Sequence, residues 1–362
     1  MTFIYSLHTT TITGNTNGKT LILERLLFSM AEKIRLGVIG TGMAWERLHW
    51  PALEKLRDKY EITAVCNKTL EKAQTFANSI SLPPDSVYAD YRKMLTRDDL
   101  DAVDVLVPIS ENFELARDVL NAGRHLIAEK PFASSPEAAK ELISLKTEKK
   151  LTILVAENFR YDEENVIIKK LLTNKALGET LGFIQVTGAD FEKEQTGNTF
   201  AAKEWRQHPA FKGGIFLDGG IHDIARMRFL FGEVETVSAA GCPQKKDYCA
   251  WSAISALLKF KCGIAGQYIY FSSVGELNKP PVGLRIFCTE GEIYLESKEC
   301  GKVQVFRKDG TSEEHAFTPG QGYYRELLNF WGALKNGDTI ISTPEKELGD
   351  IELVFDILRE LK

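Results

Sequence analysis

The residues best suited to acid–base chemistry lie in two short segments. In the first, LDGGIH, Asp218 and His222 are four residues apart, a spacing that would place both on one face of a helix. A carboxylate there could orient the imidazole, which could then exchange a proton with a substrate hydroxyl. The same pattern also fits a helix cap at Asp218 and a buried core histidine at His222. Chemistry and packing both remain open for this pair.

The second segment, Glu129-Lys130-Pro131, follows the β-rich run HLIAE. Ligands of open α/β sheets bind at the carboxyl ends of the strands, so we expect Lys130 to point into a cofactor crevice and take part in proton transfer. Pro131 would fix the turn and permits a cis peptide bond. An exposed strand end carrying a surface lysine is the alternative interpretation.

A glycine-rich turn connects the first predicted strand to a helical pattern. Its sequence is Gly40-Thr41-Gly42-Met43-Ala44. In a dinucleotide fingerprint the first glycine permits a tight turn, and the second lets the backbone approach a pyrophosphate at a helix N-terminus. Trp45 stands where a third small residue is usual, so we expect the helix to pack differently on the strand there.

The end of the second predicted strand bears on cofactor preference. Asn67, Lys68 and Thr69 lie where an NAD-preferring site usually presents a carboxylate to the adenosine ribose. Asn67 and Thr69 can form hydrogen bonds and Lys68 can pair with a 2′-phosphate, so we expect NADP(H) to be preferred, with NAD(H) possible. A solvated loop lysine is the alternative for Lys68.

Strands and helices alternate in the first part of the chain, which predicts a doubly wound parallel sheet. The strand patterns cover 34–40, 61–66, 102–108, 125–129 and 151–156, and the helical patterns 48–56, 70–77, 113–120 and 136–145. After residue 157 the regular alternation of strands and helices ends, and helical patterns lie at 163–172, 323–334 and 345–361. A run of strands from 234 to 317 without intervening helices predicts a large open, mostly antiparallel sheet in a second α/β domain. We therefore expect a Rossmann domain over 31–156 and a substrate-binding and oligomerisation domain over 157–362.

Composition excludes several classes of protein. The chain has 362 residues and a net charge of −5, so nucleic-acid binding is not expected, and its apolar runs are too broken by charges to span a membrane. Six cysteines without a CxxC pair argue against a metal site or disulfide framework and favour the cytoplasm. Residues 1–30 lack signal-peptide features, and we expect a flexible extension or a misassigned start.

Taken together, GTG after the first strand, EKP, and GG followed by LDGGIH resemble the glucose–fructose oxidoreductase, inositol dehydrogenase and rhizopine-catabolism (Gfo/Idh/MocA) family. The resemblance covers roughly residues 33–362 and includes ENFRY at 157–161 and YRELLNF at 324–330. It implies a Rossmann domain plus an α/β domain whose open sheet often forms a homodimer or homotetramer interface. The chain departs from the family at Trp45 and at residues 109–113, which lack a histidine that many members carry.

The resemblance also implies roles for single residues. Lys130, Asp218 and His222 would be catalytic: His222, polarised by Asp218, would accept a hydroxyl proton while Lys130 stabilises charge on the oxygen, and the two roles could be exchanged. Cofactor contacts are expected from Gly40, Thr41, Gly42, Met43, Ala44, Asn67, Lys68, Thr69, Pro108, Glu129 and Lys130. Substrate contacts are expected from Arg160, Trp205, Arg206, His222 and Tyr324.

The expected function is an NADP(H)-preferring oxidoreductase acting on a sugar, sugar derivative or cyclitol. One alternative is a regulatory protein that binds the nucleotide without catalysis; the intact Lys130, Asp218 and His222 weigh against it. Another is a hydrolase or lyase that oxidises and re-reduces its substrate on tightly held NAD, which would show no net cofactor turnover.

Overall fold

The computed structural model describes residues 33–188, 190–273 and 282–361, so the expected extension at residues 1–30 lies outside the described residues. Its first sheet has six parallel strands in the order β3-β2-β1-β4-β5-β6. The strands are β1 (Ile34–Ile39), β2 (Tyr60–Cys66), β3 (Val87–Tyr88), β4 (Ala102–Val105), β5 (His125–Glu129) and β6 (Ile153–Ala156). This order is that of a doubly wound dinucleotide-binding sheet, which confirms the predicted fold class. Of the strands in this sheet, only the two-residue β3 was not predicted from the sequence.

Helices connect these strands, and the first of them departs from regular geometry. They are α2 (Trp50–Glu54), α3 (Leu70–Ser79), α4 (Tyr91–Leu95), α5 (Ile109–Asn121) and α6 (Pro136–Lys149). A π-helical turn, Trp45–His49, precedes α2. Trp45 is 1% exposed, and its ring meets Phe76 edge-on at 5.0 Å between centroids. The indole thus fills space that a small third residue of the fingerprint would leave, and the helix is wider there.

The second sheet has eight strands in the order β14-β13-β12-β11-β7-β10-β9-β8. They are β7 (Thr180–Gly188), β8 (Val234–Pro243), β9 (Trp251–Phe260), β10 (Ala265–Phe271), β11 (Gly283–Cys288), β12 (Gly291–Leu295), β13 (Lys302–Arg307) and β14 (Ser312–Ala316). Strand β7 pairs in parallel with β10, and the other neighbours are antiparallel. The expectation of a mostly antiparallel sheet is confirmed.

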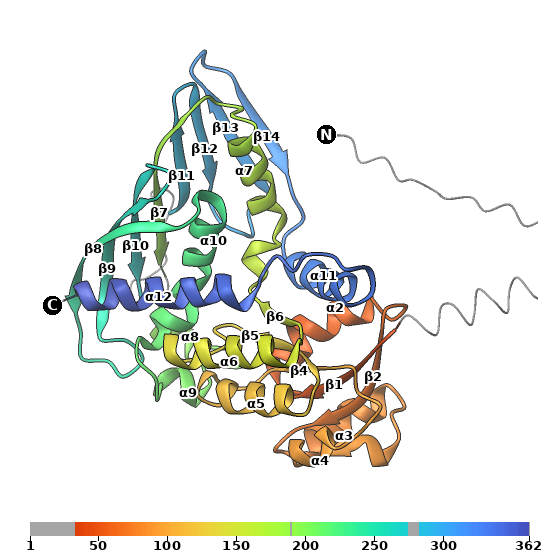
Figure 1. Ribbon diagram of the computed structural model, residues 1–362. Coiled ribbons are helices and arrows are strands. Elements are labelled where there is room, and N and C mark those ends of the chain that lie inside the picture. The colour runs from red at the N-terminus through yellow and green to blue at the C-terminus, as the bar shows by residue number, and fades with distance from the viewer. Residues whose placement is uncertain (1–32, 189, 274–281, 362) are drawn as a thin grey trace, which may run out of the picture. The chain divides into compact units, whose positions relative to one another are not determined.

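The remaining helices lie between or beside the two sheets (Figure 1). They are α7 (Glu163–Thr173), α8 (Phe191–Glu194), α9 (Glu204–Gln207), α10 (Ile221–Phe231), α11 (Gly322–Asn336) and α12 (Pro344–Glu360). Helix α11 contacts α2 and β6 of the first sheet, whereas α12 contacts β8 of the second sheet and α6 beside the first. The end of the chain therefore ties both sheets into one body.

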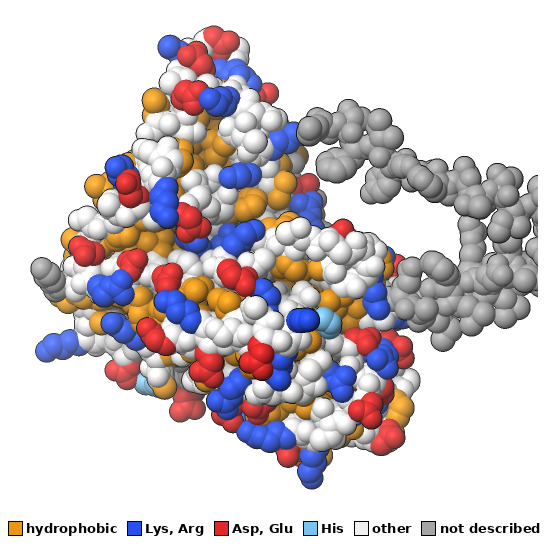
Figure 2. Space-filling model, viewed as in Figure 1, with side chains coloured by type: hydrophobic (Ala, Val, Ile, Leu, Met, Phe, Trp, Pro, Cys, Tyr) orange, Lys and Arg blue, Asp and Glu red, His pale blue; other side chains and the backbone are white. Residues whose placement is uncertain are grey.

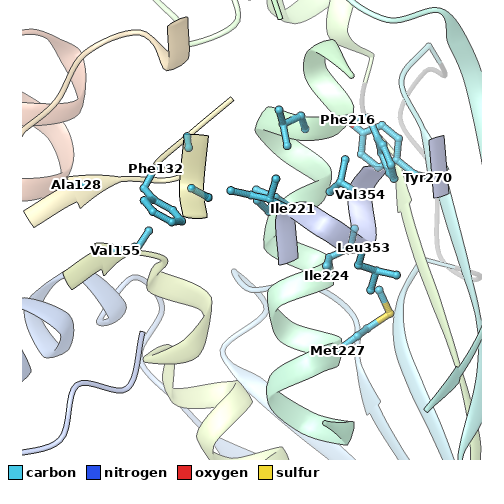
Figure 3. Packing of buried hydrophobic residues seen from close by; sticks show 14 of the residues in the cluster. Ala128, Phe132, Val155, Phe216, Ile221, Ile224, Met227, Tyr270, Leu353 and Val354 are labelled. Carbon is cyan, nitrogen blue, oxygen red and sulfur yellow. The ribbon is translucent and has the colours of Figure 1, made fainter. Parts of the chain in front are cut away.

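Helix α10 is the centre of the shared core (Figure 3). Its buried residues Ile221, Ile224 and Met227 belong to the same hydrophobic cluster as Leu353 and Val354 of α12. The cluster continues through Ala128, Phe132 and Val155 around the first sheet and through Phe216 and Tyr270 beside the second. This packing fixes the start of α10 relative to the end of β5, where the expected catalytic residues lie.

The surface is mixed in charge, with acidic and basic side chains interspersed across the face shown in Figure 2. Among the helices that the structure describes, none is both long and apolar enough to cross a lipid bilayer.

Candidate active site

The glycine-rich turn lies at the carboxyl edge of the first sheet. Gly40 has φ +101°, and a Cβ there would come 2.1 Å from the carbonyl oxygen of Leu106, so only glycine fits. A Cβ added at Gly42 would meet no described atom within 4 Å, so the backbone borders open space where the helix begins. The side chain of Thr41 accepts a hydrogen bond of 3.0 Å from Asn67 Nδ2. A backbone cradle next to open space suits a dinucleotide pyrophosphate.

Lys68 lies beside this cradle and is already partnered. Its Nζ is 2.7 Å from Glu111 Oε2, and the Lys68 side chain is 80% exposed. Glu111 belongs to the first turn of α5, which follows Pro108. An exposed ion pair contributes roughly 0–1 kcal/mol, so an incoming phosphate can displace Glu111 from Lys68.

Lys130 leaves the end of β5 and reaches across to the turn before α10. Its Nζ donates to the carbonyl oxygen of Asp218 at 2.7 Å and to Oδ1 of Asp218 at 3.0 Å. The amide of Asn112, on α5, donates to the carbonyl oxygens of Glu129 (3.2 Å) and Pro131 (3.0 Å). The Lys130–Pro131 peptide bond is cis. The strand end that carries Lys130 is thus held from two sides.

Asp218 forms ion pairs with Lys130 and Arg206. The prediction that it orients His222 is therefore wrong. Its carboxylate, 5% exposed, pairs with Lys130 Nζ and Arg206 Nε. Burial opposes ionisation, but the positive charges of Lys130 and Arg206 outweigh it and hold the pKa of Asp218 well below its usual value. Both oxygens are engaged by these two cations, because Asp218 lies in the π-helical turn Phe216–Gly220 that faces β5.

The carboxylate that orients His222 is Glu157. His222 Nδ1 lies 2.8 Å from Glu157 Oε1, and Phe159 N donates to the same oxygen at 3.1 Å. The imidazole stacks on the Phe159 ring, with centroids 4.6 Å apart. Glu157 is fully buried and follows β6 directly. An acidic residue at the carboxyl end of a parallel strand is a sign of a functional role that the sequence contains. On this basis a role was expected for Glu129, but Glu157 was overlooked.

Of the residues expected to bind substrate, Arg206 lies beside Asp218 and Trp205 lies against Arg206. The Arg206 guanidinium is bonded to Asp218, and its carbon lies 4.1 Å from the centroid of the Trp205 ring. Both residues belong to the short helix α9, which brings them to the same place as Lys130.

Arg160 and Tyr324, also expected to bind substrate, pack in other parts of the protein. Arg160 is 3% exposed and is ion-paired with Glu347 and Asp350 of α12, so its expected substrate contact is wrong: a buried guanidinium needs these carboxylates. Tyr324 packs with the hydrophobic cluster around Trp45 and Leu327, and its expected substrate contact stays a prediction.

Three glycines before and within the LDGGIH segment lie against the core of the protein. A Cβ at Gly214 would lie 2.1 Å from the Tyr248 carbonyl oxygen, and one at Gly220 would lie 2.7 Å from the Phe216 ring. Gly213 and Gly214 also have positive φ angles. These glycines allow the chain to pass close to its own core.

The sequence also gave no sign of a role for His49 and Asp104. His49 is fully buried and contacts the carboxylates of Asp104 and Glu129. From the sequence, His49 falls in a helical pattern and Asp104 in an apolar strand. Their contact, together with that of Glu129, joins three elements that are separate in the sequence.

Comparison with known proteins gives a consistent result for both halves of the chain. Residues 34–157 match an oxidoreductase family with the NAD-binding Rossmann fold, and residues 166–294 match the GFO/IDH/MocA C-terminal domain. The first match covers all six strands of the first sheet, and the second covers β7 to β11 and most of β12 of the second sheet.

Similar whole proteins are found in fungi and bacteria. An uncharacterised protein of Saccharomyces cerevisiae is 27% identical over 84% of this chain and 88% of its own length. The protein named scyllo-inositol 2-dehydrogenase (NADP(+)) IolW of Bacillus subtilis is 25% identical over 91% of this chain and 87% of its own. The crystal structure of an oxidoreductase from Thermotoga maritima superimposes with a TM-score of 0.79 at 28% identity, covering 91% of this chain and 96% of that one.

Proposed function

This chain belongs to the GFO/IDH/MocA family of NAD(P)-binding oxidoreductases, and from that premise we propose that it is an NADP(H)-preferring dehydrogenase of sugars, sugar derivatives or cyclitols. One observation carries the proposal. Lys130 from the first sheet meets the Asp218 carboxylate from the segment before α10, and His222 follows one turn later with its own carboxylate, Glu157. A cation and a proton acceptor thus flank the carboxyl edge of a nucleotide-binding sheet.

Lys130 is suited to hold the substrate oxygen. An ammonium group has three N–H donors, and two of them point to Asp218 O and Oδ1. The third donor remains for a substrate hydroxyl or carbonyl oxygen. A positive charge at that oxygen stabilises the negative charge that develops on it during the reaction.

His222 is suited to move the proton. The Glu157 carboxylate accepts from Nδ1, so the neutral imidazole carries its proton there and presents Nε2 as the acceptor. In the oxidative direction Nε2 takes the hydroxyl proton, and the imidazolium that results is stabilised by Glu157. In the reductive direction the same nitrogen returns the proton to the carbonyl oxygen.

The residues around the open cradle fit a nicotinamide dinucleotide. Backbone N–H groups of Thr41, Gly42, Met43 and Ala44 would hold the pyrophosphate, and Pro108, Glu129 and Lys130 would border the nicotinamide end. When bound, the nicotinamide accepts or supplies the hydride. Asn67, Lys68 and Thr69 would meet the adenosine ribose. The absence of a carboxylate at these three positions, together with the NADP(+) in the name of the Bacillus relative, supports the NADP(H) preference.

The substrate class rests on the polar and aromatic groups beside Asp218. Arg206 and Trp205 offer a guanidinium and an aromatic ring, which suit hydroxyl groups and the face of a sugar or cyclitol ring. The name of the Bacillus relative includes scyllo-inositol, which supports a cyclic polyol.

A second copy of the chain is the partner we propose. Leu257 is 58% exposed and Ile184 is 37% exposed, and both are in register with Gln267 on the outer face of the second sheet. Covering such apolar side chains favours association into a homodimer or homotetramer. Sedimentation velocity should show a species of at least twice the chain mass; a monomer at micromolar concentration contradicts this part of the proposal.

The function is tested by fluorescence titration with NADPH and NADH, followed by absorbance assays with NADP⁺ and a panel of aldoses, ketoses and inositols. We expect tighter binding of NADPH and turnover of at least one polyol. Binding of neither nucleotide contradicts the proposal. Tight binding without turnover on the whole panel would move it toward transient redox chemistry or a regulatory role.

A further inference from the structure

His49 has no role in the proposed mechanism, yet it is a buried histidine between two carboxylates. Its side chain is completely buried, with Nδ1 2.8 Å from Asp104 Oδ2 and Nε2 3.1 Å from Glu129 Oε1. Asp104 lies in the middle of the first sheet, on β4 between β1 and β5, and is also fully buried. The imidazole therefore bridges the centre of the sheet and its carboxyl edge.

Glu129 contacts both His49 and the backbone of Lys130. Its second carboxylate oxygen, Oε2, accepts the backbone N–H of Lys130 at 3.1 Å. The same strand end is held from α5 by Asn112, through the carbonyl oxygens of Glu129 and Pro131. The Glu129 carboxylate is thus the link between His49 and the peptide unit from which the Lys130 side chain starts.

Electrostatics make this link strong. Burial opposes a charge on the imidazole, but Asp104 and Glu129 outweigh it, and the pKa of His49 is raised well above its usual value. Burial likewise favours a neutral Glu129, but its hydrogen bond to His49 and the charge of His49 hold the pKa of Glu129 below its usual value. A cationic imidazole between carboxylates forms charge-assisted hydrogen bonds, which are stronger than neutral ones.

We propose that His49 is a positioning residue for Lys130, acting through Glu129, with Asp104 as its anchor in the sheet. This rests on the proposed function, because it concerns the lysine that holds the substrate oxygen. Lys130 Nζ lies close to Asp218 only while the end of β5 keeps its place, and His49 fixes the carboxylate that accepts the Lys130 N–H. A displacement of about 1 Å at a catalytic group lowers rates by up to roughly a hundredfold.

Two substitutions separate the two contacts of His49. The side-chain amide of asparagine approximates the position of Nδ1, so His49→Asn keeps the bond to Asp104 and loses the one to Glu129. The longer glutamine approximates Nε2, so His49→Gln keeps the bond to Glu129 and leaves Asp104 unpaired. Each variant is the control for the other.

The two variants should then rank in opposite order in stability and in turnover. His49→Gln should have the lower Tm, because it leaves a fully buried carboxylate without its partner. His49→Asn should have the lower kcat, by about tenfold or more relative to His49→Gln, with a Kd for NADPH within about twofold of the parent. The assay is NADP⁺ reduction with scyllo-inositol and D-glucose as probe substrates. Crystal structures of both variants should show Lys130 Nζ moved away from Asp218 only in His49→Asn.

Other results would overturn the inference. If kcat falls in parallel with Tm in the two variants, or if His49→Asn keeps the parent's kcat, His49 is structural. Should both variants fail to fold, Glu129→Gln makes the same test, since one amide oxygen cannot accept from both His49 and the Lys130 peptide. In that variant an unchanged kcat refutes the positioning role.

The proposed function is tested separately by Lys130→Met. If Lys130→Met keeps the parent's turnover, the function assigned to the lysine is wrong whatever the His49 variants do. If Lys130→Met loses turnover while the His49 variants behave like the parent, only the positioning inference is wrong. A parent inactive on both probes is a failure of the proposed substrate class, and the crystal structures of the variants still decide the position of Lys130.

Discussion

His222 is bonded to Glu157, which lies 65 residues earlier in the chain, and Asp218, its neighbour by four residues, is bonded to Lys130 and Arg206. Each of the two groups in the proposed mechanism, Lys130 and His222, therefore has its own carboxylate. Asp218 holds the cation at Lys130, and Glu157 sets the tautomer of His222. In the proposed mechanism, stabilisation of the substrate oxygen and proton transfer thus depend on different carboxylates.

Glu157→Gln should lower kcat by about a hundredfold. Phe159 N–H donates to the same oxygen that faces His222 Nδ1, so glutamine keeps an amide oxygen there and the tautomer is unchanged. Its neutral amide, however, no longer stabilises the imidazolium that forms when Nε2 takes the proton. Steady-state kinetics with NADP⁺ and a polyol measure the effect. Glu179→Gln is the control, because Glu179 forms only an exposed pair with Lys175. Equal kcat for Glu157→Gln and the parent would show that the charge of this carboxylate does not assist proton transfer by His222.

Lys130→Met should lose at least tenfold in turnover and leave the Kd for NADPH nearly unchanged. Methionine keeps an unbranched apolar stem but cannot donate to the substrate oxygen. Lys140→Met is the matched control, since Lys140 is 58% exposed and pairs with Glu352 on the surface. If the two variants have the same kcat, the lysine has no part in the reaction.

Glu111→Gln should raise the affinity for NADPH by up to about fivefold and change that for NADH less. Removing the carboxylate frees Lys68 for a 2′-phosphate, because the phosphate no longer competes with an ion pair at 2.7 Å. Lys68→Glu should shift the preference toward NADH. Fluorescence titrations of both nucleotides give the ratio, and a ratio that is constant across both variants would mean that this loop does not recognise the 2′-phosphate.

Arg160→Met should destabilise the protein by about 3–5 kcal/mol, because it leaves the buried carboxylates of Glu347 and Asp350 without this cation. Urea unfolding measures the loss. The KM of the folded variant should stay near that of the parent. A raised KM without a loss of stability would instead restore the substrate contact expected from the sequence.

Glu326→Gln should increase stability at pH 8 relative to the parent. Glu326 is fully buried, and neither of its carboxyl oxygens has a hydrogen-bond partner among the described residues. Burial raises its pKa well above the usual value, so the parent is stabilised most below the unfolded pKa of about 4.3 and loses that stability as pH rises toward the folded pKa. Urea unfolding between pH 5 and pH 8 should show a flatter dependence in the variant, and an identical slope would contradict a neutral Glu326.

Local patterns in the sequence were sufficient for the architecture. Alternating strand and helix periodicity identified the order of elements, and the glycine at position 40 marked the turn because only glycine tolerates φ +101° beside Leu106. Lys130 was correctly expected at the carboxyl edge, since the ends of parallel strands meet there. Each of these features depends on a few consecutive residues.

Which charges pair with which was decided only by the tertiary structure. The partners of His222, Arg160 and His49 come from other elements. The packing of α10 and α12 selects those of His222 and Arg160, and the pairing of β4 with β5 places those of His49. A four-residue spacing places Asp218 near His222 along the chain, but a buried carboxylate binds the cations that the fold brings to it. Burial makes every such pairing obligatory, and sequence spacing carries no information on contacts across the core.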